Sequence, residues 1–384
     1  MAEIEKIYQV NLQRHFGGGE VYTHFFSKAL LKLGWKVALF VDTRAKFWNS
    51  MDMSGIEMLP VRRAEDICTY LPERNSLVIT HAPVSGKLLD RMQDHIYCSF
   101  AHMPLYQRRA EPFIPCRAVF GVSQYVLDTM AEKGLTNYYP TPLYGVADLR
   151  RNKEGVHGEV WTQPSFDWDE QKGRDLVLSY LHPIYWIFRP KHRFHKREGV
   201  TLGIVSRITT IKQFPRLFQV LSPVIQRYES IKIEIFGSGG YASMRDLKKS
   251  LKPIRDQVRF WGHQDSVENV YPLMDFVLTG LPEKEALGLN VIEAQACNTP
   301  ALAVRAAPFT ETVLDGKTGF FYTDPRQDSG QDFDRLLWRI LTLDRFPRPI
   351  EAAGHLEKFS FDAFTGRVQK AVEFAFTRHG SDNP

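Results

Sequence analysis

The sequence predicts an α/β fold in which two doubly wound domains follow one another along the chain. Its 384 residues exceed what one ordinary hydrophobic core accommodates. Short β-branched and aromatic runs alternate with stretches of helical apolar spacing, a pattern typical of parallel sheets covered by helices. A segment rich in charge, proline and tryptophan interrupts the alternation once, between residues 150 and 198, and we interpret it as the zone between the domains.

The first series begins with a strand expected at residues 7–10. Gly17, Gly18 and Gly19 follow it and precede a helix expected over 20–33, which Gly34 ends. Further strands of this series are expected at residues 36–41, 76–80, 96–100 and 118–122.

The second series repeats the alternation. Helices are expected over 214–228 and directly after Gly288. Strands are expected at residues 201–205, 231–236, 258–261, 275–279 and 301–304.

Composition indicates a globular cytoplasmic protein. Hydrophobic residues make up 43% and charged residues 24% of the chain, and no apolar run approaches the length that spans a bilayer. The four cysteines are scattered without zinc-site spacing, so we expect reduced thiols. The net charge of +5 is small and the two signs are mixed, so we expect no nucleic acid partner.

Residues 185–197 combine an aromatic run with basic side chains. Such a mixture suits an anionic membrane surface or a phosphorylated acceptor. A solvated linker that contributes a few core aromatics is the alternative. The basic residues of the stretch are Arg189, Lys191, His192, Arg193, His195, Lys196 and Arg197.

Because ligands bind at the carboxyl ends of parallel strands, the loops that follow strands are the candidate site. Gly17, Gly18 and Gly19 would let backbone N–H groups approach an anion at a helix N-terminus, although a structural tight turn explains them equally well. Arg207 and Lys212, on the loop after residue 205, are spaced to converge on a diphosphate or are solvated surface cations.

The loop after residue 279 carries two carboxylates. Gly288 and Leu289 would open a helix whose N–H groups attract phosphate. Glu285 precedes this helix, and Glu293 lies one turn into it. This placement suits the recognition of hydroxyl groups on a sugar. Two glutamates near a helix start can also act only as partners of the helix dipole.

Together these loops resemble the family-4 retaining glycosyltransferases, whose GT-B fold has two Rossmann-like doubly wound domains facing a central cleft. The most specific mark is a glutamate, seven residues and a second glutamate, matched by Glu285 and Glu293 within E-A-L-G-L-N-V-I-E-A-Q-A-C-N-T-P. Arg207 and Lys212 are similar to the family's G-R-x-x-x-x-K loop. Residues 17–20, 236–239 and 308–320 resemble three further family segments.

The resemblance implies three parts: an acceptor-side domain at 1–185, a nucleotide-sugar domain at 186–357, and a final helix at 358–384 that crosses back onto the first domain. It implies that Glu293 binds the ribose, that Arg207 and Lys212 hold the diphosphate, and that Glu285 lies beside the transferred sugar. The other residues implied for donor binding are Gly17, Gly18, Gly237, Ala286, Leu287, Gly288 and Leu289.

The family also places a histidine near the sugar, for which His102 is favoured over His81; either can instead be structural. Arg108 and Arg109 follow His102 and are candidates for the acceptor side, as is His81. Arg207, Lys212, Glu285 and His102 form the expected catalytic set. No cofactor or metal is implied, because cations and a helix N-terminus stabilise the leaving diphosphate.

The resemblance implies transfer from a UDP- or GDP-linked sugar to a sugar or lipid-linked saccharide, in bacterial surface polysaccharide, lipopolysaccharide or glycolipid synthesis. The acceptor would attack the anomeric carbon on the same face from which the diphosphate leaves. The protein would be cytoplasmic or peripheral on the inner face of the membrane. Departures from the family pattern at Gln213, Asn290 and Asn298 put the loop shape in question. A catalytically silent nucleotide-sugar-binding scaffold and a GT-B sugar-nucleotide 2-epimerase are the alternatives.

Overall fold

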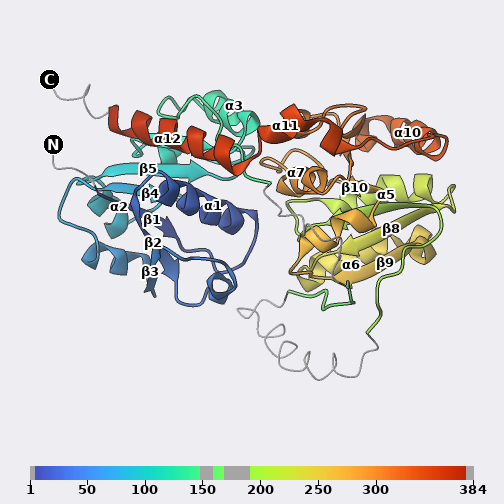
Figure 1. Cartoon of the computed structure of the whole chain (residues 1–384), viewed down its shortest axis with the longest axis horizontal. Helices are drawn as coiled ribbons and strands as arrows, with labels where there is room; N and C mark the ends of the chain where they lie inside the picture. Colours follow the sequence, from blue (N-terminus) through green and yellow to red (C-terminus); the bar gives the residue numbers. More distant parts are fainter. Residues whose placement is uncertain (1–4, 148–158, 168–190, 378–384) are drawn as a thin grey trace. The chain divides into compact units, whose positions relative to one another are not determined.

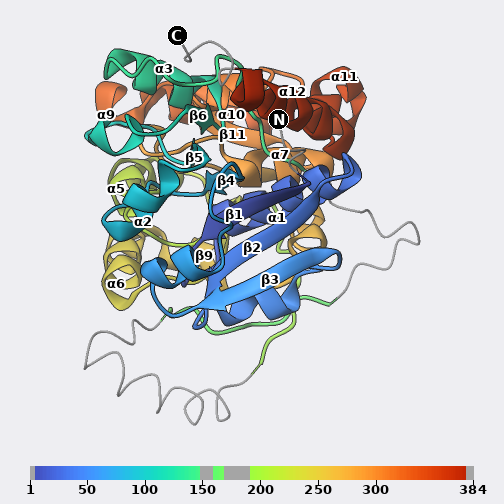
Figure 2. The ribbon, with the colours of Figure 1, turned by 90° about the vertical axis from the view of Figure 1, so that its left-hand side faces the viewer.

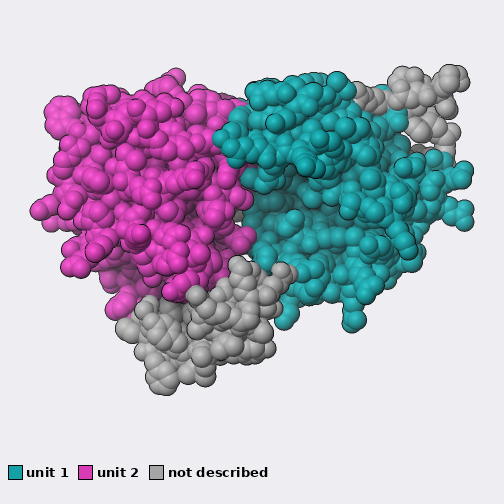
Figure 3. Space-filling model, turned by 180° about the vertical axis from the view of Figure 1, so that it is seen from behind, with its two compact units in different colours: residues 1–147, 357–384 teal, residues 148–356 magenta. Residues whose placement is uncertain are grey.

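The computed structural model describes residues 5–147, 159–167 and 191–377 and divides into two compact units (Figure 3). Unit 1 comprises residues 1–147 and 357–384, and unit 2 comprises residues 148–356. Each unit contains one six-stranded parallel sheet. The predicted pair of doubly wound α/β domains is therefore confirmed.

Unit 1 has the strand order β3-β2-β1-β4-β5-β6 (Figures 1 and 2). Its short 3-10 helices span Lys46–Ser50, Ala64–Thr69 and Glu111–Phe113. Its strands and helices are β1 (Lys6–Asn11), α1 (Gly18–Lys32), β2 (Lys36–Asp42), β3 (Ile56–Val61), β4 (Leu77–Thr80), α2 (Lys87–Met92), β5 (Ile96–Ala101), β6 (Ala118–Gly121), α3 (Gln124–Glu132) and α12 (Phe361–Thr377).

Unit 2 has the order β12-β11-β10-β7-β8-β9. Its 3-10 helices span Lys252–Gln257, Val267–Asn269, Tyr271–Leu273 and Pro349–Glu351. Its strands and helices are β7 (Val200–Val205), α5 (Phe214–Ile225), β8 (Ile231–Phe236), α6 (Tyr241–Ser250), β9 (Val258–Gly262), β10 (Phe276–Leu278), α7 (Leu289–Ala296), β11 (Ala301–Val304), α8 (Phe309–Thr312), β12 (Gly319–Tyr322), α9 (Pro325–Asp328), α10 (Gln331–Leu341) and α11 (Ala353–Glu357), whose last residue belongs to unit 1.

The central strands are buried on both faces, as expected for parallel sheets between helical layers. Every residue of β5 and of β7 is buried. In unit 1, Tyr22 and Phe26 of α1 pack edge-on against Phe100 of β5. Tyr22 also packs against Phe364 of α12, so the last helix of the chain completes the core of the unit that contains the first strand.

The structure moves the domain boundary that the sequence predicts. Residues 159–167 belong to unit 2 and not to the first domain. The N–H of Gln163 donates to the carbonyl of Trp261, and that of Asp167 donates to the carbonyl of Gly239. Because these bonds tie the segment to loops and strands of unit 2, the first domain ends before it.

The edge strands β3 and β12 were not expected from the sequence. β3 contains Pro60, which is tolerated at a sheet edge because it has no N–H to donate. β12 is only four residues long and contains Gly319, where a Cβ atom would lie 2.2 Å from the carbonyl oxygen of Ala301. Pro60 and Gly319 weaken the strand pattern of these two runs, because proline and glycine are depleted in strands.

The basic half of the 185–197 stretch lies within the described residues from Lys191 onward, and its aromatic run lies outside them. Lys196 pairs with Asp275 at 2.7 Å. Arg197 pairs with Glu234 at 2.8 Å, and Glu234 is fully buried and also accepts from the Trp261 indole. The described part of the stretch therefore has structural partners within unit 2. No helix that the structure describes is both long and apolar enough to cross a membrane.

Two departures from the family pattern occupy left-handed backbone positions. Gln213 has φ 54° and Asn298 has φ 63°, a region that side chains other than glycine enter at a cost. Asparagine tolerates this region better than most residues, and the Asn298 side-chain oxygen accepts from the N–H of Ile350. Both residues therefore occupy backbone positions that favour glycine.

We expect Asn298→Ala to lower the free energy of unfolding by about 1–2 kcal/mol, because alanine bears the full cost of the left-handed conformation and loses the bond to Ile350. Asn298→Gly is expected to cost less, because glycine adopts positive φ readily. Urea denaturation of both variants checks this. Equal losses for alanine and glycine would contradict the backbone explanation.

Candidate functional site

Three loops meet at the carboxyl edge of the sheet in unit 2. β7 pairs with both β8 and β10, so the loops that follow these strands are neighbours. The N–H of Ile208 donates to Ser238 O at 2.8 Å, and the N–H of Leu281 donates to Lys212 O at 3.2 Å. The central loop, which carries Arg207 and Lys212, is therefore bonded on both sides through its backbone.

Two glycines permit this close packing. A Cβ atom at Gly237 would lie 1.9 Å from the carbonyl oxygen of Ser206, and one at Gly280 would lie 2.1 Å from that of Lys212. Gly237 also has φ +149°. The contact between loops explains glycine at 237, which the sequence assigned to the donor, and it shows a need for Gly280 that no motif indicated.

Lys212 and Glu285 are brought together although 73 residues separate them. The Lys212 ammonium forms an ion pair with Glu285 Oε2, and the Ala286 N–H donates to Glu285 Oε1 at 3.2 Å. The two side chains are only 21% and 12% exposed. A lysine ammonium has three donors, so Lys212 can keep Glu285 and still bind an anion.

Sequence reasoning missed a second polar group beside this pair. The Gln213 amide donates to Glu283 Oε2 at 3.0 Å, and Glu283 also pairs with Arg326. Gln213 immediately follows Lys212 and precedes α5, so these bonds anchor the end of the loop that carries Arg207 and Lys212. The only hint in the sequence is that Gln213 stands where the family has glycine.

Arg207 lies at the start of the same loop with a different partner. Its guanidinium contacts Asp167 at 3.3 Å, and its side chain is 37% exposed. Asp167 belongs to the segment that the sequence placed in the other domain. Arg207 and Lys212, which lie on one loop, therefore pair with different carboxylates.

The start of α7 presents backbone groups at the same edge. Gly288 precedes the helix with φ 80° and ψ 58°, and Val291 is bonded back to its carbonyl at 2.9 Å. The N–H groups of Leu289 and Asn290 come before this first turn is closed, where a helix N-terminus attracts negative charge. Ala286 and Leu287, which were expected to contact the donor, are buried.

Glu293, one turn into α7, is held by a residue that no motif indicated. The Tyr271 hydroxyl donates to Glu293 Oε2 at 2.7 Å. Burial raises the pKa of Glu293, while the Tyr271 hydroxyl and the charge of Lys212 act in the opposite direction. Burial, followed by the charge of Glu293, raises the pKa of Tyr271 well above its usual value, so the phenol stays protonated and fixes the carboxylate.

In unit 1, His81 and His102 follow the neighbouring strands β4 and β5. His81 Nδ1 and His102 Nε2 are 2.9 Å apart, and the rings are stacked with centroids 5.2 Å apart. His81 Nε2 lies 3.0 Å from Gln9 Oε1. The two histidines that the sequence left as competitors for one role therefore form one pair.

The hydrogen bonds of Gln9 indicate the tautomers. The Gln9 amide nitrogen donates to Ser27, so its oxygen is the atom that faces His81 and accepts a proton from His81 Nε2. Neutral His81 then has an acceptor at Nδ1, which suits donation from His102 Nε2. Thr23 also lies 3.1 Å from this Nδ1, and its hydroxyl is within reach of the Gly19 carbonyl as well. The arrangement leaves His102 Nδ1 as the acceptor nitrogen.

We expect the pair to make the protein less stable in mild acid. Burial lowers the pKa of His102 to about 4 and that of His81 well below 6.5. The unfolded chain therefore takes up protons below pH 6.5 that the folded chain does not, and stability falls from pH 6.5 toward pH 4. Between pH 6.5 and 5 the loss attributable to His102 is about 1–2 kcal/mol.

Denaturant unfolding at pH 5 and pH 7.5 measures this loss. His102→Gln, which removes the titrating ring, is expected to reduce the difference between the two pH values. A difference as large as in the wild type would show that other groups cause the pH dependence.

The remaining sequence candidates in unit 1 are less constrained. None of Gly17, Gly18 and Gly19 has positive φ, and a Cβ atom at Gly19 would meet nothing within 4 Å. A tight turn therefore does not explain the three glycines. Arg108 and Arg109 are exposed on the loop after β5. No group of three or more metal-binding side chains occurs in the described ranges.

Comparison with known proteins connects this arrangement to a family. The model of the family "Glycosyl transferases group 1" matches residues 186–344, which include both glutamates and the Arg207–Lys212 loop. This segment is therefore similar in sequence to the glycosyl transferases group 1 family. The structure is of the GT-B type.

Curated relatives match over part of the chain. N-acetyl-alpha-D-glucosaminyl L-malate synthase of Bacillus anthracis is 30% identical over 155 residues, 39% of this chain and 40% of the relative. D-inositol 3-phosphate glycosyltransferase of Actinosynnema mirum is 28% identical over 44% of this chain and 42% of its own length. The matched segment thus spans about two fifths of each relative.

Solved structures match over nearly the whole chain. HepE of Anabaena in complex with UDP and glucose has a TM-score of 0.68 at 14% identity, covering 96% of this chain and 99% of that one. Sucrose-phosphate synthase of Thermosynechococcus elongatus has a TM-score of 0.69 at 15% identity, covering 97% and 99%. At these identities the likeness concerns the fold.

Proposed function

We propose that this protein is a retaining glycosyltransferase that moves a sugar from a UDP- or GDP-linked donor to an acceptor hydroxyl, without a metal or cofactor. The observation that carries the proposal is the meeting of two predicted loops in unit 2. Lys212, Glu285 and the start of α7, the helix that carries Glu293, lie at one sheet edge. Such an edge is where parallel α/β sheets bind nucleotides.

In the proposed reaction, the bond between the anomeric carbon and the diphosphate breaks as the acceptor oxygen bonds to that carbon on the same face. The departing diphosphate gains negative charge and takes the acceptor's proton. Arg207, Lys212 and the N–H groups of Leu289 and Asn290 stabilise this charge, because donors fixed in a partly dry site interact most strongly with charge that develops there.

The remaining residues orient the substrates. Glu293, fixed by Tyr271, accepts hydrogen bonds from the ribose hydroxyls. Glu285 orients Lys212 through their ion pair and lies beside the transferred sugar. In unit 1, His102 presents its acceptor nitrogen Nδ1 for a sugar hydroxyl, and the N–H groups of Gly17 and Gly18 are available to a phosphate.

We further propose that the acceptor is a sugar or a lipid-linked saccharide of bacterial surface polysaccharide, lipopolysaccharide or glycolipid synthesis, reached from the cytoplasmic face of the membrane. The sequence resemblance supports this context, and Arg108 and Arg109 are exposed cations suited to an anionic acceptor. Comparing product formation with soluble sugar acceptors and with lipid-linked acceptors in vesicles tests it.

Release of free UDP or GDP from a panel of sugar nucleotides tests the activity itself. We expect one donor to be turned over by the wild type and at least about tenfold more slowly by Glu285→Ala, because the variant loses the group that orients Lys212. The matched control is Glu311→Ala, a carboxylate on the short helix α8 of the same unit. Intact nucleotide binding with no turnover of any donor would favour a catalytically silent binding protein.

A further inference from the structure

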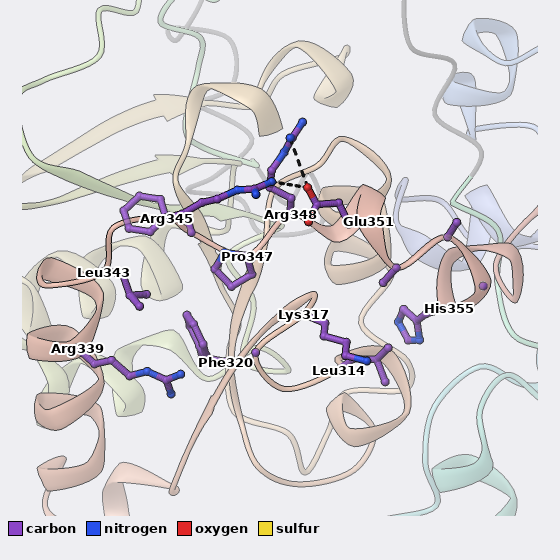
Figure 4. A pocket seen from close by; sticks show the side chains of 15 residues that line it. Leu314, Lys317, Phe320, Arg339, Leu343, Arg345, Pro347, Arg348, Glu351 and His355 are labelled. Atoms are coloured by element: carbon purple, nitrogen blue, oxygen red, sulfur yellow. Dashed lines mark hydrogen bonds and ion pairs between the residues drawn. The ribbon is translucent and has the colours of Figure 1, made fainter.

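A basic pocket of about 810 Å³ lies elsewhere in unit 2 (Figure 4). Its walls come from the loop that carries Lys317, from Phe320 of β12, from Arg339 of α10 and from the segment 343–355 that follows α10. None of the loops at residues 206–213, 237–240 and 280–288 contributes to its lining. The pocket is therefore separate from the candidate donor site.

Positive charge dominates the lining. The lining contains one carboxylate, that of Glu351, and four cationic side chains, those of Lys317, Arg339, Arg345 and Arg348. Glu351 pairs with Arg345 and, at 3.4 Å, with Arg348. In the part of the chain that the structure describes, Lys317 and Arg339 have no carboxylate partner. The four cations and the one carboxylate give the lining a net charge of about +3.

The cations come from different directions around the hollow. In Figure 4, Arg345, Arg348 and Glu351 lie on one side, Arg339 and Phe320 on a second, and Lys317 with His355 on a third. The Arg339 guanidinium lies 4.5 Å from the centroid of the Phe320 ring. This contact holds an otherwise exposed arginine against the wall and leaves its N–H groups as donors.

We propose that this pocket binds a phosphate-bearing ligand that carries at least two negative charges. Arginine presents a planar fork of donors that matches phosphate oxygens, and lysine adds a compact charge. The volume lies within the range of about 300–1,000 Å³ that is usual for ligand sites. Leu343, Phe346 and Pro347 add an apolar wall suited to the organic part of such a ligand.

The carboxylate of Glu351 does not prevent binding. Its two arginine partners are 62% and 50% exposed, and ion pairs this exposed are weak because water screens them. An arriving phosphate can therefore share or displace Glu351. The ligand is either a soluble organic phosphate or the headgroup of an anionic phospholipid, because both offer the same phosphate chemistry.

Calorimetric titration with inorganic pyrophosphate tests the pocket in the full chain. The reference protein carries Arg207→Ala and Lys212→Ala, so that the candidate donor site does not contribute. Adding Lys317→Glu is expected to weaken pyrophosphate binding at least tenfold, because it replaces an attraction by a repulsion. Adding Lys249→Glu, on exposed α6, makes the same charge change outside the pocket and is expected to leave binding within about twofold.

The wild-type background gives an independent measurement. There, Lys317→Glu is expected to remove one class of pyrophosphate site while thermal unfolding stays unchanged, because Lys317 is exposed. Arg339→Gln, which tests the stacked arginine, is expected to weaken the same class. Pyrophosphate binding that is equal with and without Lys317→Glu, together with vesicle binding that is also equal, would overturn the proposal.

Flotation with vesicles distinguishes the two sources of phosphate. Binding to vesicles of phosphatidylcholine with phosphatidylglycerol, but not to phosphatidylcholine alone, assigns the pocket to a lipid headgroup if Lys317→Glu abolishes it. Pyrophosphate binding that depends on Lys317 without any vesicle binding assigns it to a soluble phosphate. Either result supports the proposed chemistry.

Discussion

Lys212→Ala is expected to lower turnover by about 10²–10³-fold, the usual loss when one fixed donor to a developing anion is removed. Lys212 lies on the loop after β7, and its position is held by the ion pair with Glu285 and by the backbone bond from Leu281. As the sugar leaves, negative charge grows on the diphosphate. The interaction with this ammonium therefore strengthens in the transition state and raises kcat.

The same substitution leaves Glu285 without its cation, so a loss of folding stability has to be separated from a loss of catalytic rate. The double variant Lys212→Ala/Glu285→Gln removes the unpaired charge and is expected to recover most of the lost stability without recovering turnover. Lys249→Ala on α6 is the surface control. A kcat for Lys212→Ala within threefold of the wild type, measured by nucleotide release, would contradict the proposed role.

Glu293→Ala is expected to weaken nucleotide binding by about 1.5–3 kcal/mol, or roughly 10–150-fold, as for a lost hydrogen bond to a charged group. Tyr271 occupies one lone pair of Oε2, so the carboxylate retains acceptor positions for ribose hydroxyls. Because the ribose does not react, the loss is expected mainly in Kd and KM and less in kcat.

Deoxynucleotides make this prediction specific. The wild type is expected to bind the ribonucleotide more tightly than its 2′- or 3′-deoxy analogue, and Glu293→Ala is expected to bind them about equally. Tyr271→Phe keeps the carboxylate but frees it to move, so it is expected to lose part of the preference. If Glu293→Ala retains the full preference for the ribonucleotide in calorimetry, then the ribose is bound elsewhere.

The strands that carry the site were predictable because of where they lie in each sheet. β1, β4 and β5 in unit 1 and β7, β8 and β10 in unit 2 are inner strands, and burial on both faces requires the continuous apolar runs by which they are recognised. β3 and β12 were missed because Pro60 and Gly319 weaken their strand pattern, whereas the other two edge strands, β6 and β9, were predicted. The boundary was misplaced because residues 159–167 join unit 2 through backbone bonds, which leave no trace in side-chain pattern.

The fold class and the loops that hold the candidate site could be predicted, because strand periodicity, Gly288 and the charges at Arg207, Lys212, Glu285 and Glu293 are local features of the sequence. Which group each charge meets depends on the tertiary structure. The pairs are Lys212 with Glu285, Tyr271 with Glu293, Gln9 with His81, and His81 with His102, and 21 to 73 residues separate their members. They follow from the strand order, which sets which loop ends lie side by side and which no local pattern encodes.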